Sequence, residues 1–160
     1  MVLILSENDV KKSINMKQAI NTVELSFDLL GKNKVKMTQR SELSYPDTPA
    51  TVRTFTSSID IIGALGTKMV LGKPQSRKKD LTYFLGILYD SQDSHVVAIM
   101  AANRLTQLRT GAASAVATKY LCTKQNVKVG LFGSGVQARG QIEGLNEILE
   151  IDEIKIYDIM

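Results

Sequence analysis

Apolar and polar positions alternate along the chain in a way that predicts short strands interspersed with amphipathic helices. Strands are predicted in the first hundred residues at 2–5, 35–43, 52–58, 67–71, 81–89 and 96–100. Helices are predicted at about 9–14, from Met16 to a C-capping Gly31, and over the alanine-rich stretch 105–121. This order predicts an α+β region over residues 1–124.

Residues 125–160 follow a different pattern, which predicts a strand, a glycine turn, a helix and a second strand. The apolar run Val127–Phe132 leads into the sequence GSGVQA at 133–138, and helix-compatible sequence continues to about Leu149. A second apolar strand at 154–157 ends in Asp158. The predicted unit is the first β-α-β part of an incomplete α/β Rossmann domain.

The glycine turn has the G-x-G-x-x-A form of a dinucleotide-binding motif, with an acid twenty positions after its last residue. Gly133 permits a sharp turn, Gly135 lets a pyrophosphate approach the backbone, and Ala138 lets the helix pack closely on the strand. Asp158 is placed to accept hydrogen bonds from ribose hydroxyls, and its charge repels a 2′-phosphate. The motif therefore favours NAD over NADP, although the same glycines could serve only to make a tight turn.

Length and composition restrict the possible functions. The chain has 160 residues, of which 44% are hydrophobic and 22% charged, as is usual for a soluble globular protein. A full dinucleotide-binding sheet has about six parallel strands, so two of them indicate the front portion of a larger architecture. No apolar run reaches the ~18 residues of a membrane span, and no signal peptide is recognisable.

Charge and cysteine content add weaker constraints. The net charge of +4 is mild, and the triplet Arg77-Lys78-Lys79 is interpreted as a solvated loop, so no nucleic-acid partner is expected. Cys122 is the single cysteine and cannot form an internal disulfide, so a cytoplasmic location is expected by default. Cys122 itself is expected to be a small packing residue rather than a nucleophile. His95, the single histidine, is expected at the surface, and no metal site is predicted.

Two motifs together resemble the ornithine cyclodeaminase/mu-crystallin family. They are RTGAASAVATKYL at 109–121 and GSGVQAR at 133–139, and the resemblance extends over essentially the whole chain, including ILSENDV and the Gly66-Thr67-Lys68 strand. The resemblance implies an N-terminal α+β domain that binds substrate and forms a homodimer, followed by a Rossmann domain that holds NAD(P). Members act on the carbon–nitrogen bond of an amino acid or imine.

The resemblance also implies roles for individual residues. Arg40 and Lys68 would bind the substrate carboxylate, and Arg109 would lie between substrate and cofactor; Lys68 is also the candidate for catalytic proton transfer. The residues expected to contact the dinucleotide are Arg109, Thr110, Gly133, Gly135, Gln137, Ala138 and Asp158. Arginine suits a carboxylate because it can donate two parallel hydrogen bonds. Surface or interdomain salt bridges are the alternative for the two arginines.

Some positions depart from the family pattern. The chain has Ala101-Ala102 where many members carry an acidic residue and a glycine, and Thr82-Tyr83 where they commonly have Pro-Thr or Pro-Ser. The family's catalytic aspartate and the remaining parallel strands belong to a half that the 160 residues lack.

Two functions are therefore compatible with the sequence. The first is the N-terminal part of an NAD-dependent oxidoreductase or lyase of this family, which would lack turnover by itself. The second is a non-catalytic truncated paralogue that dimerises or binds a small carboxylate. The residues leave open which amino acid or imine is used, whether it is deaminated or reduced, and whether the shortness arises from the gene or from the choice of fragment.

Overall fold

A computed structural model describes residues 1–47, 50–72 and 83–159. The triplet Arg77-Lys78-Lys79, Thr82 and the predicted start of a strand at residue 81 lie outside the described residues. The chain divides into two compact units, one of Met1–Lys12 with Asp28–Arg104 and the other of Ser13–Phe27 with Leu105–Met160. The boundary predicted between residues 124 and 125, at which the α+β region ends and the Rossmann domain begins, stays a prediction.

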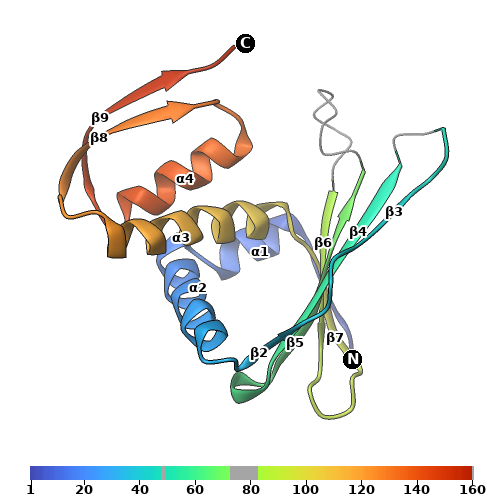
Figure 1. The fold of residues 1–160 in the computed structure, drawn as a ribbon. Helices are drawn as coiled ribbons and strands as arrows, with labels where there is room; N and C mark the ends of the chain where they lie inside the picture. Colours follow the sequence, from blue (N-terminus) through green and yellow to red (C-terminus); the bar gives the residue numbers. More distant parts are fainter. Residues whose placement is uncertain (48–49, 73–82, 160) are drawn as a thin grey trace. The chain divides into compact units, whose positions relative to one another are not determined.

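The first unit contains a seven-stranded mixed sheet (Figure 1). Its strands are β1 (Leu3–Leu5), β2 (Val35–Met37), β3 (Ser41–Ser44), β4 (Thr51–Ile59), β5 (Ala64–Leu71), β6 (Tyr83–Tyr89) and β7 (Val96–Ala101). They follow the order β1-β7-β6-β5-β4-β2, and β3 also pairs with β4. Only β1 and β7 run parallel among these described pairs, and the others are antiparallel.

The prediction of one strand over residues 35–43 is wrong, because the segment forms two strands separated at 38–40. Met37 pairs with Ser57, whereas Ser41 pairs with Thr54. Residues 38–40 therefore lie opposite only two residues of β4, 55 and 56. This offset of one residue interrupts the strand pairing, as a β-bulge does. Arg40 lies in this break instead of near the end of a strand.

The connection between β4 and β5 is shorter than predicted. A single 3₁₀ turn, Asp60–Ile62, ends at Gly63, whose φ of 61° is in the left-handed region that favours glycine. β5 begins directly afterwards, so Gly66 belongs to the strand and not to the connection.

The three predicted helices that precede the glycine turn are present, although the first and the third each begin two residues earlier than predicted. α1 (Glu7–Ser13) follows Ser6, whose backbone amide donates to Asp9 at 2.9 Å while its hydroxyl accepts from the Asp9 amide at 3.3 Å. This reciprocal arrangement is a capping box, and it starts the helix two residues before the predicted position. α2 spans Met16–Gly31 and α3 spans Asn103–Leu121.

The second unit ends in the predicted strand, turn, helix and strand (Figure 1). β8 (Asn126–Phe132) and β9 (Glu150–Tyr157) are parallel and are connected through α4 (Val136–Asn146). The helix is shorter than predicted, and β9 starts four residues earlier. The chain therefore has an α+β region followed by the first β-α-β unit of a Rossmann domain.

The core of this unit lies between α2 and α3. Its buried residues are Met16, Ala19, Ile20, Leu108, Ala112, Ala115 and Val116, with Ile148 packed against them. Small residues on α3 let α4 approach its backbone. A Cβ added to Gly111 would lie 1.9 Å from the carbonyl oxygen of Gly140, and one added to Gly144 would lie 2.5 Å from that of Gly111. Among the described residues, none of the helices is long and apolar enough to span a bilayer.

Candidate functional site

A row of paired residues crosses the middle of the large sheet and carries Lys68. Phe55 of β4 pairs with Lys68 of β5, which pairs with Gly86 of β6. The ammonium group of half-buried Lys68 lies 4.9 Å from the ring centroid of Phe84 and 6.0 Å from that of Phe55. A lysine inside an apolar strand is thus placed against two aromatic faces, which attract cations.

Arg40 reaches the same ring from the break between β2 and β3. Its guanidinium carbon lies 4.8 Å from the centroid of Phe55. The structure therefore brings Arg40 and Lys68, predicted from the resemblance as carboxylate ligands, to one aromatic side chain. Whether they bind substrate stays a prediction.

The acid nearest to Arg40 in the sequence, Glu42, is bound by another residue. Arg53 donates to the two carboxylate oxygens of Glu42, from Nε at 2.7 Å and from Nη2 at 3.1 Å. These hydrogen bonds hold the pKa of Glu42 below its ordinary value, and the charge of Arg40 makes a smaller contribution. Within the described part of the chain, Arg40 has no hydrogen bond or ion pair to an acid.

The second candidate site is the turn between β8 and α4. Gly133 has a φ of 92°, which a residue with a side chain rarely adopts, and its amide donates to the carbonyl of Tyr157 at 2.8 Å. Ser134 donates to one carboxylate oxygen of Asp158, from its amide at 2.5 Å and from its hydroxyl at 2.6 Å. The predicted ribose-binding acid therefore lies directly against the glycine turn.

The N-terminus of α4 has the features expected of a phosphate site. Gly135 is its N-cap, so no N-cap side chain accepts hydrogen bonds from the first amides of the helix, and the space where a Cβ would lie is open. The first turn carries no acidic residue. Gln137 is exposed and Ala138 is half-buried beside Leu131 in a shallow apolar groove. Unpaired N–H groups at such an end attract anions.

The predicted residues of α3 are less clearly arranged for binding. Arg109 is exposed. The hydroxyl of Thr110 donates to the carbonyl of Thr106 at 2.7 Å, and the carbonyl of Thr110 accepts from Gln141 of α4 at 3.5 Å. Thr110 thus connects α3 to the helix that follows the glycine turn, and its contact with a dinucleotide stays a prediction.

His95 lies at the surface, as the sequence predicted, whereas the packing role expected of Cys122 stays a prediction. His95 is exposed, and its Nδ1 lies 2.5 Å from Asp93 in the turn before β7. Cys122 is half-buried after the end of α3 and is a free thiol.

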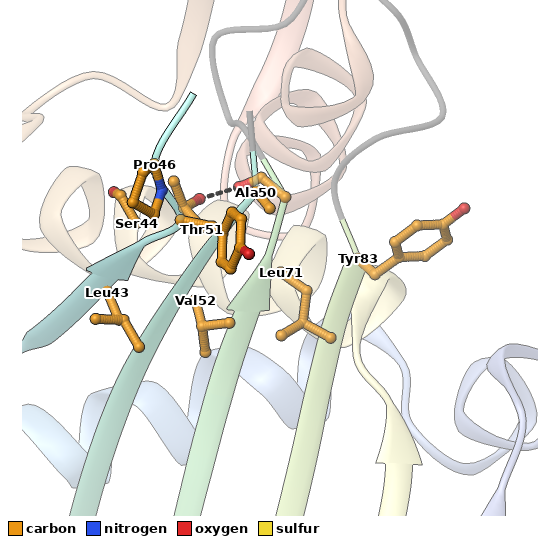
Figure 2. A pocket seen from close by; sticks show the side chains of 10 residues that line it. Leu43, Ser44, Pro46, Ala50, Thr51, Val52, Leu71 and Tyr83 are labelled. Carbon is orange, nitrogen blue, oxygen red and sulfur yellow. Dashed lines mark hydrogen bonds between the residues drawn. The ribbon is translucent and has the colours of Figure 1, made fainter. Parts of the chain in front are cut away.

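An apolar cavity of about 680 Å³ lies at one end of the strands β3 to β6 (Figure 2). Leu43, Val52, Leu71 and Tyr83 form a row of paired residues along it. Leu71 is three residues from Lys68 in β5, so the two side chains project from opposite faces of the sheet. The cavity is therefore separate from the row that carries Lys68.

Sequence reasoning missed Phe55 and Ser134. Phe55 is one of several apolar residues in a predicted strand, and only strand pairing places it beside Lys68. Ser134 occupies a position of the glycine motif at which any residue is allowed. Its hydroxyl could nevertheless have been predicted to contact Asp158, because both residues follow the ends of neighbouring predicted strands.

A sequence model described as the ornithine cyclodeaminase/mu-crystallin family matches residues 2–160. An alanine dehydrogenase of Archaeoglobus fulgidus is 33% identical over 159 residues, which cover 98% of this chain and 48% of the relative. A Delta(1)-pyrroline-2-carboxylate reductase of Bacillus cereus is 28% identical over 159 residues, with 98% and 49% covered. The chain spans about half the length of these curated relatives.

Solved structures agree with this similarity. The Delta(1)-pyrroline-2-carboxylate reductase of Thermococcus litoralis, in complex with NADH and L-proline, matches with a TM-score of 0.92 and 35% identity over 99% of this chain and 50% of its own. An archaeal alanine dehydrogenase dimer with bound NAD matches with a TM-score of 0.89 and 34% identity, covering 99% of this chain and 49% of that one.

Proposed function

This chain belongs to the ornithine cyclodeaminase/mu-crystallin family, and from that premise we propose that it is the N-terminal part of an NAD-dependent enzyme. The enzyme would act on the carbon–nitrogen bond of an amino acid or imine, either by deamination and cyclisation or by imine reduction. The observation that carries the proposal is the contact between the glycine turn and Asp158. This contact brings the glycine turn and the acid of the dinucleotide-binding motif next to each other.

NAD fits the residues of this turn. Pyrophosphate oxygens would accept hydrogen bonds from the N-terminus of α4 beyond Gly135, and the dipole of the helix favours their charge. Asp158 would accept hydrogen bonds from the adenosine ribose, and its charge disfavours a 2′-phosphate. Gln137, Ala138, Thr110 and Arg109 complete the proposed contacts.

The amino-acid or imino-acid substrate would be held by its carboxylate. Arg40 and Lys68 provide two cations at one ring, and Glu42 is already paired with Arg53. When bound, NAD supplies the acceptor or donor of hydride at the α-carbon. In the direction of imine reduction, the ammonium of Lys68 would donate a proton to the imine nitrogen as hydride adds to the α-carbon, and in the reverse direction the neutral amine so formed would take that proton back.

Calorimetric titration of the 160-residue chain with NAD tests the nucleotide site. We expect micromolar binding, at least tenfold weaker binding after Asp158→Ala, and unchanged binding after Asp152→Ala, which removes an exposed acid from β9, the strand that Asp158 follows. No NAD binding by a folded chain would contradict the proposal for these 160 residues.

Homodimerisation is proposed through the face of the sheet that carries the apolar cavity (Figure 2). Leu43, Tyr45 and Tyr83 are large and exposed there, and contiguous exposed apolar surface is typical of protein interfaces. The free thiol of Cys122 suits a cytoplasmic location.

A non-catalytic role is the second candidate. β9 has β8 as its sheet partner, and Ile154 and Ile156 are exposed along it within the described chain. Such an apolar strand at a sheet edge favours association with another chain. A folded chain that dimerises or binds a small carboxylate, but not NAD, would support this role.

A further inference from the structure

The ring of Phe55 lies beside two cations that come from different parts of the chain. We propose that Phe55 is a positioning residue, which holds Arg40 and Lys68 together in the orientation that receives one carboxylate group. This inference rests on the proposed function, because it assigns a role within the same substrate site. Phe55 itself would make no bond to the reacting atoms.

Strand pairing explains why this aromatic residue serves both cations. Phe55 pairs directly with Lys68. Ser41 pairs with Thr54, so Arg40, the residue before Ser41, lies beside Phe55 on the other side. The guanidinium carbon and the ammonium nitrogen lie 4.8 and 6.0 Å from the ring centroid.

Two cations that converge on one site repel each other, so their convergence requires a compensating attraction. The face of an aromatic ring carries partial negative charge and attracts cations without occupying their hydrogen-bond donors. A carboxylate side chain would attract them more strongly, but it would also compete with the carboxylate of the substrate. A ring therefore suits a site that must hold two cations and still bind an anion.

Neighbouring groups are consistent with this role. Glu42, the nearest acid in sequence to Arg40, is engaged by two hydrogen bonds from Arg53. Phe84 lies 4.9 Å from the ammonium of Lys68, but no cation–ring contact joins it to Arg40 in the described part of the chain. Phe84 thus supports one cation, whereas Phe55 supports both, and this difference provides a matched control.

Side-chain NMR of the 160-residue chain can test the geometry without any ligand. The Arg40 Nε–H signal and the ¹³C-methylated Lys68 signal are assigned with Arg40→Lys and Lys68→Arg. We expect Phe55→Leu to move both signals, Phe84→Leu to move the Lys68 signal alone, and Phe132→Leu, at the exposed last residue of β8, to move neither. If Phe55→Leu moves neither signal while the backbone spectrum stays dispersed, the proposal is wrong.

Calorimetric titration with L-proline tests the consequence for binding. We expect Phe55→Leu to weaken binding about 3- to 10-fold, the range for a cation–ring contact at a partly exposed site, and Phe55→Tyr to restore it. Equal affinities of Phe55→Leu and the unsubstituted chain would overturn the inference. If the unsubstituted chain binds no L-proline, the proposed substrate site fails in this chain, and the NMR signals still decide whether Phe55 holds the two cations.

Discussion

Asp158 accepts two hydrogen bonds from Ser134 through a single carboxylate oxygen, at 2.5 Å from the amide and 2.6 Å from the hydroxyl. Ser134 lies in the turn between β8 and α4, two residues after the end of β8, whereas Asp158 directly follows β9. Parallel strands end at the same edge of a sheet, which is why the turn and the acid meet. Ser134 therefore holds the Asp158 carboxylate at the position where we propose that a ribose binds.

Ser134→Ala should weaken NAD binding by about 3- to 10-fold, because one charge-assisted hydrogen bond that orients Asp158 is lost at an exposed site. Ser134→Thr keeps the hydroxyl and should bind nearly normally. The measurement is calorimetric titration of each variant with NAD and NADP. Equal NAD affinity of the alanine and threonine variants would show that the hydroxyl has no orienting role.

Gly111→Ala should destabilise the second unit by at least about 2 kcal/mol, because backbone of another helix occupies the space that a methyl group needs. The added Cβ would lie 1.9 Å from the carbonyl oxygen of Gly140. Gly31→Ala is the matched control in a helix, since nothing lies within 4 Å of its added Cβ. Urea denaturation followed by circular dichroism measures both variants, and equal midpoints would contradict this account of the packing.

The glycine turn and its acid could be predicted from sequence because their signature is local. A strand, two glycines, a helix and an acid at a set distance constrain one another within 34 residues, Val127–Met160. The boundaries were less accurate: β9 begins at Glu150, and the single strand predicted at 35–43 is interrupted at Arg40. That interruption depends on an offset against β4, which no local pattern reveals.

Contacts between segments that are distant in the sequence could not be predicted either. The carboxylate of Glu7, in the first turn of α1, accepts hydrogen bonds from the amides of Asn103 at 2.6 Å and Arg104 at 3.0 Å, and so caps the start of α3. The approach of Gly111 to Gly140 and the position of Phe55 between Arg40 and Lys68 are of the same kind. Each requires the strand register or helix crossing to be known first.

Glu24→Gln should lower the stability of the folded chain near neutral pH. It should also make the loss of stability between pH 7 and 3 smaller. Glu24 of α2 accepts hydrogen bonds from Lys119 at 2.8 Å and Tyr120 at 2.5 Å, both in α3. These bonds, that of Lys119 first, hold the pKa of Glu24 below its ordinary value of 4.5.

A carboxyl group with a lowered pKa stabilises the folded state fully above the unfolded value, and this contribution is lost as the pH falls through the lowered pKa. Thermal unfolding between pH 3 and 7 should therefore show a smaller decline for Glu24→Gln than for the unsubstituted chain. Glu147→Gln, at the end of α4, is the control and should leave the decline unchanged. Parallel curves for Glu24→Gln and the unsubstituted chain would contradict the assignment.

Leu43→Asp should convert the proposed dimer to a monomer. Leu43 is 76% exposed and lines the apolar cavity, so an aspartate there would place an unpaired charge in the interface. Lys68 lies on the opposite face of the sheet, and binding of L-proline should therefore survive the substitution. Leu121→Asp is the matched control, since Leu121 is 82% exposed at the end of α3 in the other unit. Sedimentation velocity of the three chains at equal concentration is the measurement, and a dimer that persists in Leu43→Asp would place the interface elsewhere.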